Sequence, residues 1–252
     1  MKAANAYLPA NGEETEFCRH IRDISRLSEK TFTPKFSGFL TEREQRLAEY
    51  TASSVGADCG FWGGYEDAER KMFSSPSVER DNYPFEALTF FFRPKDKLTH
   101  RDFLGAFMSL GIKRDQIGDI AVTEGGAAVF ATKNAAALIF AEIEKIGRVG
   151  VKQEPGLKIV IPQQEFEEIF AVIASERIDV LVAAACGISR EKAVALIKSG
   201  RVVSDGIEVS SVSRNIDEGE VFSVKGYGKF IFSRLGFETK KGKKHALLKK
   251  YK

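Results

Sequence analysis

The sequence has 252 residues, of which 43% are hydrophobic and 29% are charged, a composition typical of a folded globular protein with two or three small domains. It has no apolar run near the ~18 residues that a membrane-spanning helix needs, and its start lacks a secretory signal, so we expect a cytoplasmic protein with no membrane partner. The cysteines Cys18, Cys59 and Cys186 form no CxxC pair, which argues against a zinc site or a disulfide framework.

The net charge of +3 conceals an asymmetry along the chain. Residues 177–252 contain 16 Lys and Arg against 8 Asp and Glu, a net of +8, and the remainder carries a net of −5. The extreme is 240–252, with seven lysines and no acidic residue. Such a block either binds a polyanion, most often nucleic acid, or forms a solvated tail, and charge alone does not decide between the two.

Residues 1–80 are expected to form a helical region. Apolar residues at helical spacing predict a helix over 13–29, and Thr41 with Glu44 is a capping-box signature for a second helix. A glycine-rich loop follows, and 66–73 is expected to begin a third helix.

Residues 81–160 predict the order strand, helix, strand, strand, helix, strand. The strands are expected over 84–92, 118–124, 126–132 and 148–154, and the helices over 99–112 and 134–147. This order predicts a ferredoxin-like (RRM-like) plait, and the whole chain an α+β fold. Many RNA-recognition domains of this kind stack bases on strand aromatics, but such residues also often form the core. The candidates here are Phe90, Phe91, Phe92 and Phe130.

Residues 176–236 predict a small domain, followed by a basic tail over 237–252. A first helix ends at Gly187, Ser189 caps a second, and Asp205-Gly206 is a two-residue hairpin signal. The start of the second helix, with its free N–H groups, is suited to a phosphate. The alternative is that its charges are ordinary solvated helix ends.

This domain resembles the S4 RNA-binding domain. The match consists of Arg177-Ile178-Asp179, Ser189-Arg190, Ala193, Leu196-Ile197, Gly200, Val202 and Gly206. The resemblance implies an RNA surface on the two helices and the adjoining hairpin, although Asp205 stands where the family usually has Asn. The predicted RNA-binding residues are Arg177, Ser189, Arg190, Lys192, Lys198, Arg201, Lys225 and Lys229.

Two further segments, GGYEDAER over 63–70 and GYGKF over 226–230, resemble signatures of the YlmH-type S4 proteins. That resemblance implies a ribosome-associated RNA-binding protein of ribosome quality control, with rRNA, tRNA and the large ribosomal subunit as partners. Its members bind large subunits that carry a blocked peptidyl-tRNA and support C-terminal tailing of the nascent chain. The alternative from the same family is an adaptor in cell division or photosystem II assembly. From residue chemistry alone, GGYEDAER is interpreted as a glycine turn with a helix start at Glu69 and Arg70.

The sequence shows no catalytic constellation. His20, His100 and His245 are isolated from one another and from metal-ligand spacing, and no glycine pair belongs to a phosphate loop or a dinucleotide motif. We therefore expect no enzyme activity, no catalytic residue, no metal, no cofactor and no small-molecule substrate. The enzyme alternative, a pseudouridine synthase, would need a larger catalytic domain.

Overall fold

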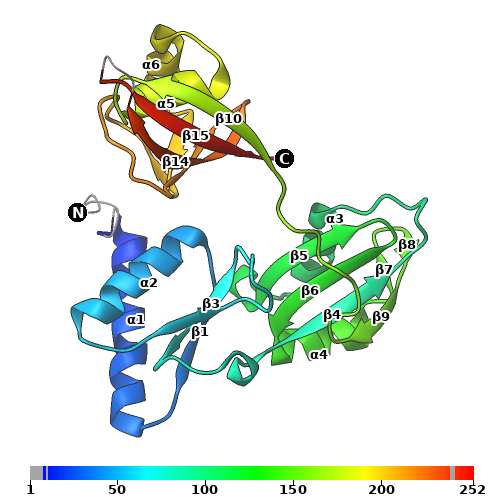
Figure 1. Ribbon diagram of the computed structural model, residues 1–252. Coiled ribbons are helices and arrows are strands. Elements are labelled where there is room, and N and C mark those ends of the chain that lie inside the picture. The colour runs from blue at the N-terminus through cyan, green and yellow to red at the C-terminus, as the bar shows by residue number, and fades with distance from the viewer. Residues whose placement is uncertain (1–7, 10, 239–241) are drawn as a thin grey trace. The chain divides into compact units, whose positions relative to one another are not determined.

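The computed structural model describes residues 8, 9, 11–238 and 242–252, and the chain divides into two compact units between Gln163 and Gln164 (Figure 1). Helices occur together with antiparallel sheets in both units, which confirms the α+β class. Each unit has its own hydrophobic core and is described by itself.

The N-terminal unit begins with two helices packed on a three-stranded antiparallel sheet. Helix α1 (Gly12–Thr31) is capped by the side chain of Asn11, and helix α2 (Glu42–Ser54) begins at the capping box of Thr41. The strands, in spatial order, are β1 (Lys35–Leu40), β3 (Lys71–Ser75) and β2 (Gly60–Trp62).

The prediction of a helical N-terminal region is therefore correct for its first two helices but misses the sheet. Residues 66–73 form no helix, and the part from Lys71 onward belongs to β3, the central strand of this sheet. Phe73 in β3 is 0% exposed and packs in one cluster with Ile21 and Ile24 of α1. Burial of this strand against α1 and α2 outweighs the helical propensity of the preceding polar residues.

The second part of the N-terminal unit is the predicted plait. After a short 3-10 turn (η2, Arg80–Asn82) its sheet has the order β5-β6-β4-β9 with every pair antiparallel, which is the ferredoxin-like arrangement. A second 3-10 turn (η3, Arg114–Gln116) precedes β5. The main elements are β4 (Phe85–Phe91), α3 (His100–Ser109), β5 (Ile117–Thr123), β6 (Gly126–Thr132), α4 (Lys133–Glu142) and β9 (Lys152–Pro155).

The second half of the plait differs in detail from its prediction. Helix α4 ends at Glu142, short of the expected 147, and a small hairpin of β7 (Lys145–Ile146) and β8 (Val149–Gly150) separates it from β9.

The core of the plait lies between its sheet and its two helices. The α3 and α4 side of the sheet is filled by apolar side chains, including Phe90, Phe103 and Ile139.

The C-terminal unit is a six-stranded antiparallel sheet with two helices packed against it. The strand order is β10-β15-β14-β13-β11-β12. The elements are β10 (Phe166–Ile173), α5 (Ile178–Cys186), α6 (Arg190–Lys198), β11 (Val202–Ser204), β12 (Ile207–Glu208), β13 (Val221–Val224), β14 (Gly228–Glu238) and β15 (Lys244–Tyr251).

The lysine-rich C-terminus is a strand in this sheet from Lys244 to Tyr251, rather than a tail. It pairs with β10 on one side and β14 on the other, and Ala246, Leu247 and Leu248 are buried. Strand β10 precedes residue 176 and β15 follows residue 236, so the sheet extends beyond both boundaries predicted for the S4-like domain. Lys240 and Lys241 lie outside the described residues.

Candidate nucleic-acid interface

Two short helices joined by a tight turn carry most of the predicted RNA-binding residues. Helix α5 ends at Gly187, whose φ of 62° lies in the left-handed region that glycine adopts without strain. Ser189 caps α6, because its hydroxyl accepts a hydrogen bond from the Lys192 N–H at 3.3 Å. The Ser189 oxygen is therefore directed toward its own helix, and local sequence determines where α6 begins.

Arg177 and Arg190 meet at one buried carboxylate. Asp179 is 1% exposed and accepts hydrogen bonds from Arg177 Nε and Nη2, each at 3.1 Å, and from Arg190 Nε at 2.8 Å. Burial favours a higher pKa for Asp179, but hydrogen bonds from the two guanidinium groups hold that pKa below its usual range. The Arg177 and Arg190 side chains remain 34% and 57% exposed. Both arginines are thus oriented by Asp179 while they stay accessible to a phosphate.

A second group of cations lies at the other end of α6. Lys198 is exposed in its last turn, and Arg201 lies three residues beyond the end of the helix. The backbone N–H of Lys225 donates to the carbonyl of Arg201 at 2.9 Å, and Arg201 Nη2 donates to the carbonyl of Lys225 at 3.4 Å. Arg201 and Lys225 therefore lie side by side. Because α6 has nine residues, the two cationic groups lie about 13 Å apart along its axis.

Tyr227 is a candidate that sequence reasoning missed. It is 40% exposed in the turn between β13 and β14, two residues after Lys225. The glycines on either side, Gly226 and Gly228, have φ values of 93° and 135° that make this turn possible. Exposed aromatics beside cations are typical of surfaces that bind single-stranded nucleic acid. The sequence signal for it is GYGKF, in which an aromatic residue lies between two glycines and close to two lysines.

Lys229 does not join the cations around α6. In β14 it pairs with Ser223, whereas its neighbour Phe230 pairs with Phe222 in the core beneath α5 and α6. Adjacent residues of a strand point to opposite faces, so Lys229 lies on the other face of the sheet. There its Nζ lies 4.6 Å from the ring centroid of Tyr251. The remaining predicted residues all lie on or beside α5 and α6.

Two carboxylates next to this surface are turned inward. Asp205 is 6% exposed, and its Oδ1 accepts a hydrogen bond from the Val221 N–H at 3.2 Å. Glu220 is 7% exposed and lies 2.7 Å from Arg214 Nη2. The carboxylate that replaces the usual Asn of S4 domains therefore joins the hairpin turn to β13 and is not displayed to a phosphate.

The GGYEDAER segment docks on the plait. Asp119 in β5 accepts hydrogen bonds from the Tyr65 hydroxyl at 2.8 Å, the Glu69 N–H at 2.7 Å and the Arg70 N–H at 3.0 Å. Burial, together with the Asp119 charge, raises the pKa of Tyr65. The helix start expected at Glu69 and Arg70 is wrong, because their N–H groups are held by Asp119 in a non-helical segment.

Arg70 extends this docking. Its Nη2 donates to the carbonyl of Phe39 at 2.6 Å, and its Nε donates to the carbonyl of Ile117 at 3.2 Å. Arg70 therefore joins β1 to the start of β5, which is a structural role. Its charge also acts on the neighbouring Arg114: burial lowers the pKa of Arg114 to about 10, and the Arg70 charge contributes to this shift.

The same docking covers the sheet face on which RRM-like domains stack bases. The Tyr65 ring stacks on Phe130 with 5.4 Å between centroids, and Phe130 is only 2% exposed. Phe90 is 0% exposed on the opposite face, against Phe103 of α3. Of the two alternatives for these aromatics, core packing therefore applies to Phe90 and Phe130, and neither ring is accessible to a base. Phe91 and Phe92 are only partly exposed.

The plait still displays cations in the loop between β4 and α3. Arg93, Lys95 and Lys97 are exposed there, and Arg93 Nε forms an ion pair with Asp96 at 2.7 Å. All three cations of this loop are thus accessible, and Arg93 is oriented by its acidic neighbour.

Two family models match the chain. One, described as "Putative RNA-binding domain in YlmH", matches residues 91–156, and the S4 domain model matches residues 176–222. The first range lies in the plait, and the second contains α5, α6 and the hairpin. The chain therefore contains an S4 domain, and its plait is similar to the domain that the first model describes.

Similarity to individual proteins extends over most of the chain. "Ribosome-associated protein quality control protein P2" of Bacillus subtilis (strain 168) is 28% identical over 238 residues, which cover 92% of this chain and 93% of the relative. A solved structure, "Cell division protein ylmH from Streptococcus pneumoniae", matches with a TM-score of 0.53 and 23% identity over 61% of this chain and 99% of that chain. The first match confirms the resemblance to YlmH-type S4 proteins, and the second supports the fold.

No described helix is long and apolar enough to cross a membrane. Across the described residues, no group of three or more His, Cys, Asp or Glu side chains is arranged to hold a metal ion.

Proposed function

We propose that this protein binds structured rRNA or tRNA on the large ribosomal subunit and acts in the cytoplasm in rescue of stalled translation and nascent-chain tailing. It acts by binding and not by catalysis. The observation that carries the proposal is the pair of cationic groups at the two ends of α6 within a matched S4 domain. Phosphate contacts position a protein on a nucleic acid, and arginine and lysine supply most of them.

Arg190 and Lys192 at the start of α6, with Arg177 beside them, contact one stretch of phosphates in this proposal. Lys198 and Arg201 contact the next, together with Lys225. Asp179 holds Arg177 and Arg190 in place before RNA arrives, which reduces the side-chain entropy lost on binding. Lys95 and Lys97 of the plait provide a second contact.

The ribosomal part of the proposal rests on the Bacillus subtilis relative, whose name is that of a ribosome-associated quality control protein. Co-sedimentation of tagged protein with ribosomal subunits on sucrose gradients, followed by crosslinking and sequencing of bound RNA, tests it. We expect the protein in the large-subunit fractions with enriched rRNA or tRNA. Protein that stays at the top of the gradient at low salt, with neither RNA enriched, would overturn the proposal.

The assigned surface is tested separately with an Arg190→Ala, Lys198→Ala double variant. The matched control is Arg19→Ala, Arg26→Ala, which removes two exposed cations from α1. We expect the first pair to leave the large-subunit fractions and the second pair to remain. Equal sedimentation of both variants would show that RNA is bound elsewhere.

A further inference from the structure

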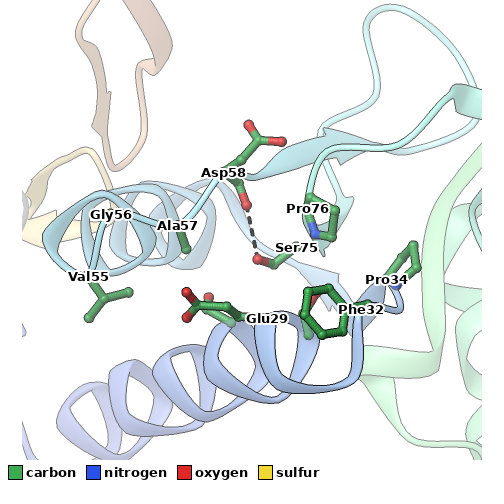
Figure 2. Close-up of a pocket in the computed structure, with 11 residues that line it drawn as sticks. Glu29, Phe32, Pro34, Val55, Gly56, Ala57, Asp58, Ser75 and Pro76 are labelled. Carbon is green, nitrogen blue, oxygen red and sulfur yellow. Dashed lines mark hydrogen bonds between the residues drawn. The ribbon is translucent and has the colours of Figure 1, made fainter.

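A cavity of about 390 Å³ opens in the N-terminal unit between the C-terminal ends of α1 and α2 (Figure 2). Phe32 and Val55, the residues that terminate α1 and α2, both line it. The back wall is the end of β3, where the Ser75 hydroxyl donates to the carbonyl of Asp58 at 3.0 Å. This volume falls within the ~300–1,000 Å³ of small-ligand pockets.

The rim of the cavity is apolar and exposed. Phe32 has 94% of its surface accessible and Val55 39%, so the Phe32 ring is almost entirely uncovered and Val55 is partly exposed. Phe32 also has a φ of 54°, a left-handed conformation that non-glycine residues rarely adopt. A large aromatic ring held in this way beside a cavity, with Pro34 and Pro76 also lining it, gives an occupant an apolar surface to pack against.

The electrostatics of the cavity favour a cation. Its lining contains no Lys or Arg, although Lys30 and Lys35 are close in sequence. Figure 2 shows Glu29 in the opening between Val55 and Phe32. No ion pair of Glu29 is found among the residues that the structure describes.

The surroundings of the cavity also favour a cation. Helices α1 and α2 both end at the cavity, and the C-terminal end of a helix carries a partial negative charge. Residues 8–83 contain 14 Asp and Glu against 10 Lys and Arg, a net of −4. A nucleic-acid phosphate is therefore repelled at this site, whereas a cationic side chain is attracted.

We propose that this cavity is a docking site for a basic segment of a protein partner, which inserts a Lys or Arg side chain toward Glu29 and packs an apolar neighbour on Phe32. The aliphatic stem of such a side chain fits the apolar walls, and its charged end reaches the carboxylate at the opening. The site is independent of RNA binding by α6, because it lies in the other unit.

NMR titration of the full-length, isotope-labelled protein tests this proposal. The probes are the peptide Ac-Leu-Arg-Leu-Gly-NH2 and its citrulline counterpart, which is similar in shape but uncharged. We expect the arginine peptide to shift the amide signals of Val55, Ala57 and Ser75, and the citrulline peptide to bind at least tenfold more weakly. No shifts at these amides, or equal binding of both peptides, would overturn the proposal.

Charge variants provide a second readout. Glu29→Gln should weaken binding of the arginine peptide at least tenfold, because the carboxylate at the opening is removed. Glu16→Gln, an exposed change on the same helix about 20 Å away, should leave binding unchanged. Equal effects of the two variants, or saturation of the same amides by a short oligouridylate, would assign the cavity to another ligand. None of these results depends on whether the α6 surface binds RNA.

Discussion

At the scale of single residues, Asp119 connects the GGYEDAER segment to the plait. It accepts one side-chain and two backbone hydrogen bonds, so Asp119→Ala leaves three donors without their partner. We expect the free energy of unfolding to fall by about 2 kcal/mol, because partly buried donors lose their acceptor. Urea unfolding measures this loss. Asp115→Ala, an exposed acidic neighbour, should change stability by less than about 0.5 kcal/mol. Equal losses would show that the hydrogen bonds to Asp119 contribute no more than surface charge.

Glu176 makes the stability of the C-terminal unit depend on pH. Hydrogen bonds from Arg234 at 2.7 and 2.9 Å and from Lys244 at 3.0 Å lower the pKa of Glu176 to about 2. The folded-state pKa lies below the unfolded value of ~4.3, so this carboxylate stabilises the fold above about pH 5. The contribution is lost as pH falls toward 2, when Glu176 becomes protonated in the folded state as well.

A Glu176→Gln variant removes that pH dependence. Because Arg234 and Lys244 are 43% and 47% exposed, solvent screening reduces the effect, and we expect wild type to lose about 1–2 kcal/mol more than the variant between pH 6 and pH 3. Urea unfolding at both pH values measures the difference. Parallel losses in the two proteins would mean that other carboxylates determine the acid sensitivity.

At the scale of elements, β15 determines whether the C-terminal unit folds. It lies inside the sheet between β10 and β14, and Leu248 is 0% exposed. A chain that ends at Gly242 should lose the folded C-terminal unit, seen as collapse of its amide signals in NMR spectra, while the N-terminal unit stays folded. Leu248→Ala should cost about 2–4 kcal/mol. If the C-terminal unit of the truncated chain stays folded, the lysine-rich C-terminus is a dispensable tail and not a required strand.

The elements that could be predicted from sequence are those fixed by local signals. The capping residues Thr41 and Thr99 start α2 and α3 as expected, and Asp205-Gly206 forms the predicted turn. Strand β3 was missed because its partners lie far along the chain: Asp119 holds the segment before it through a contact 50 residues away. Strand β15 was missed because its lysines conceal a short apolar centre that only β10 and β14 bury.

The sequence predicts which residues form the candidate RNA-binding site better than it predicts how those residues are arranged. The S4-like motif identified the cations around α6, since the helix starts and stops are local. It could not show that Arg177 and Arg190 share Asp179, or that Lys229 lies across the sheet. Both depend on how the helices pack on strands that come later in the chain.

At the scale of the whole molecule, basic residues are concentrated toward the C-terminus: residues 7–163 contain 21 Lys and Arg against 23 Asp and Glu, and residues 164–252 contain 16 against 12. Of the eight Asp and Glu in 177–252, Asp179, Asp205 and Glu220 are buried, so the exposed surface that these residues contribute is short of acidic groups. The first 83 residues lack this basic excess, and their cavity carries a carboxylate at its opening. A polyanion is therefore directed to the C-terminal unit, where association should be strongly dependent on salt.

This charge distribution predicts which lysines determine that dependence. Each phosphate contact releases counterion, so Lys198→Ala and Lys225→Ala should each reduce the slope of log affinity against log salt by about 0.7–0.9. Lys229→Ala should leave the slope unchanged, because Lys229 points away from α6 and lies over Tyr251. Fluorescence anisotropy of a labelled RNA hairpin between about 50 and about 300 mM KCl measures the three slopes. A loss for Lys229→Ala equal to the other two would place RNA on the opposite face of the sheet and remove α6 as the principal contact.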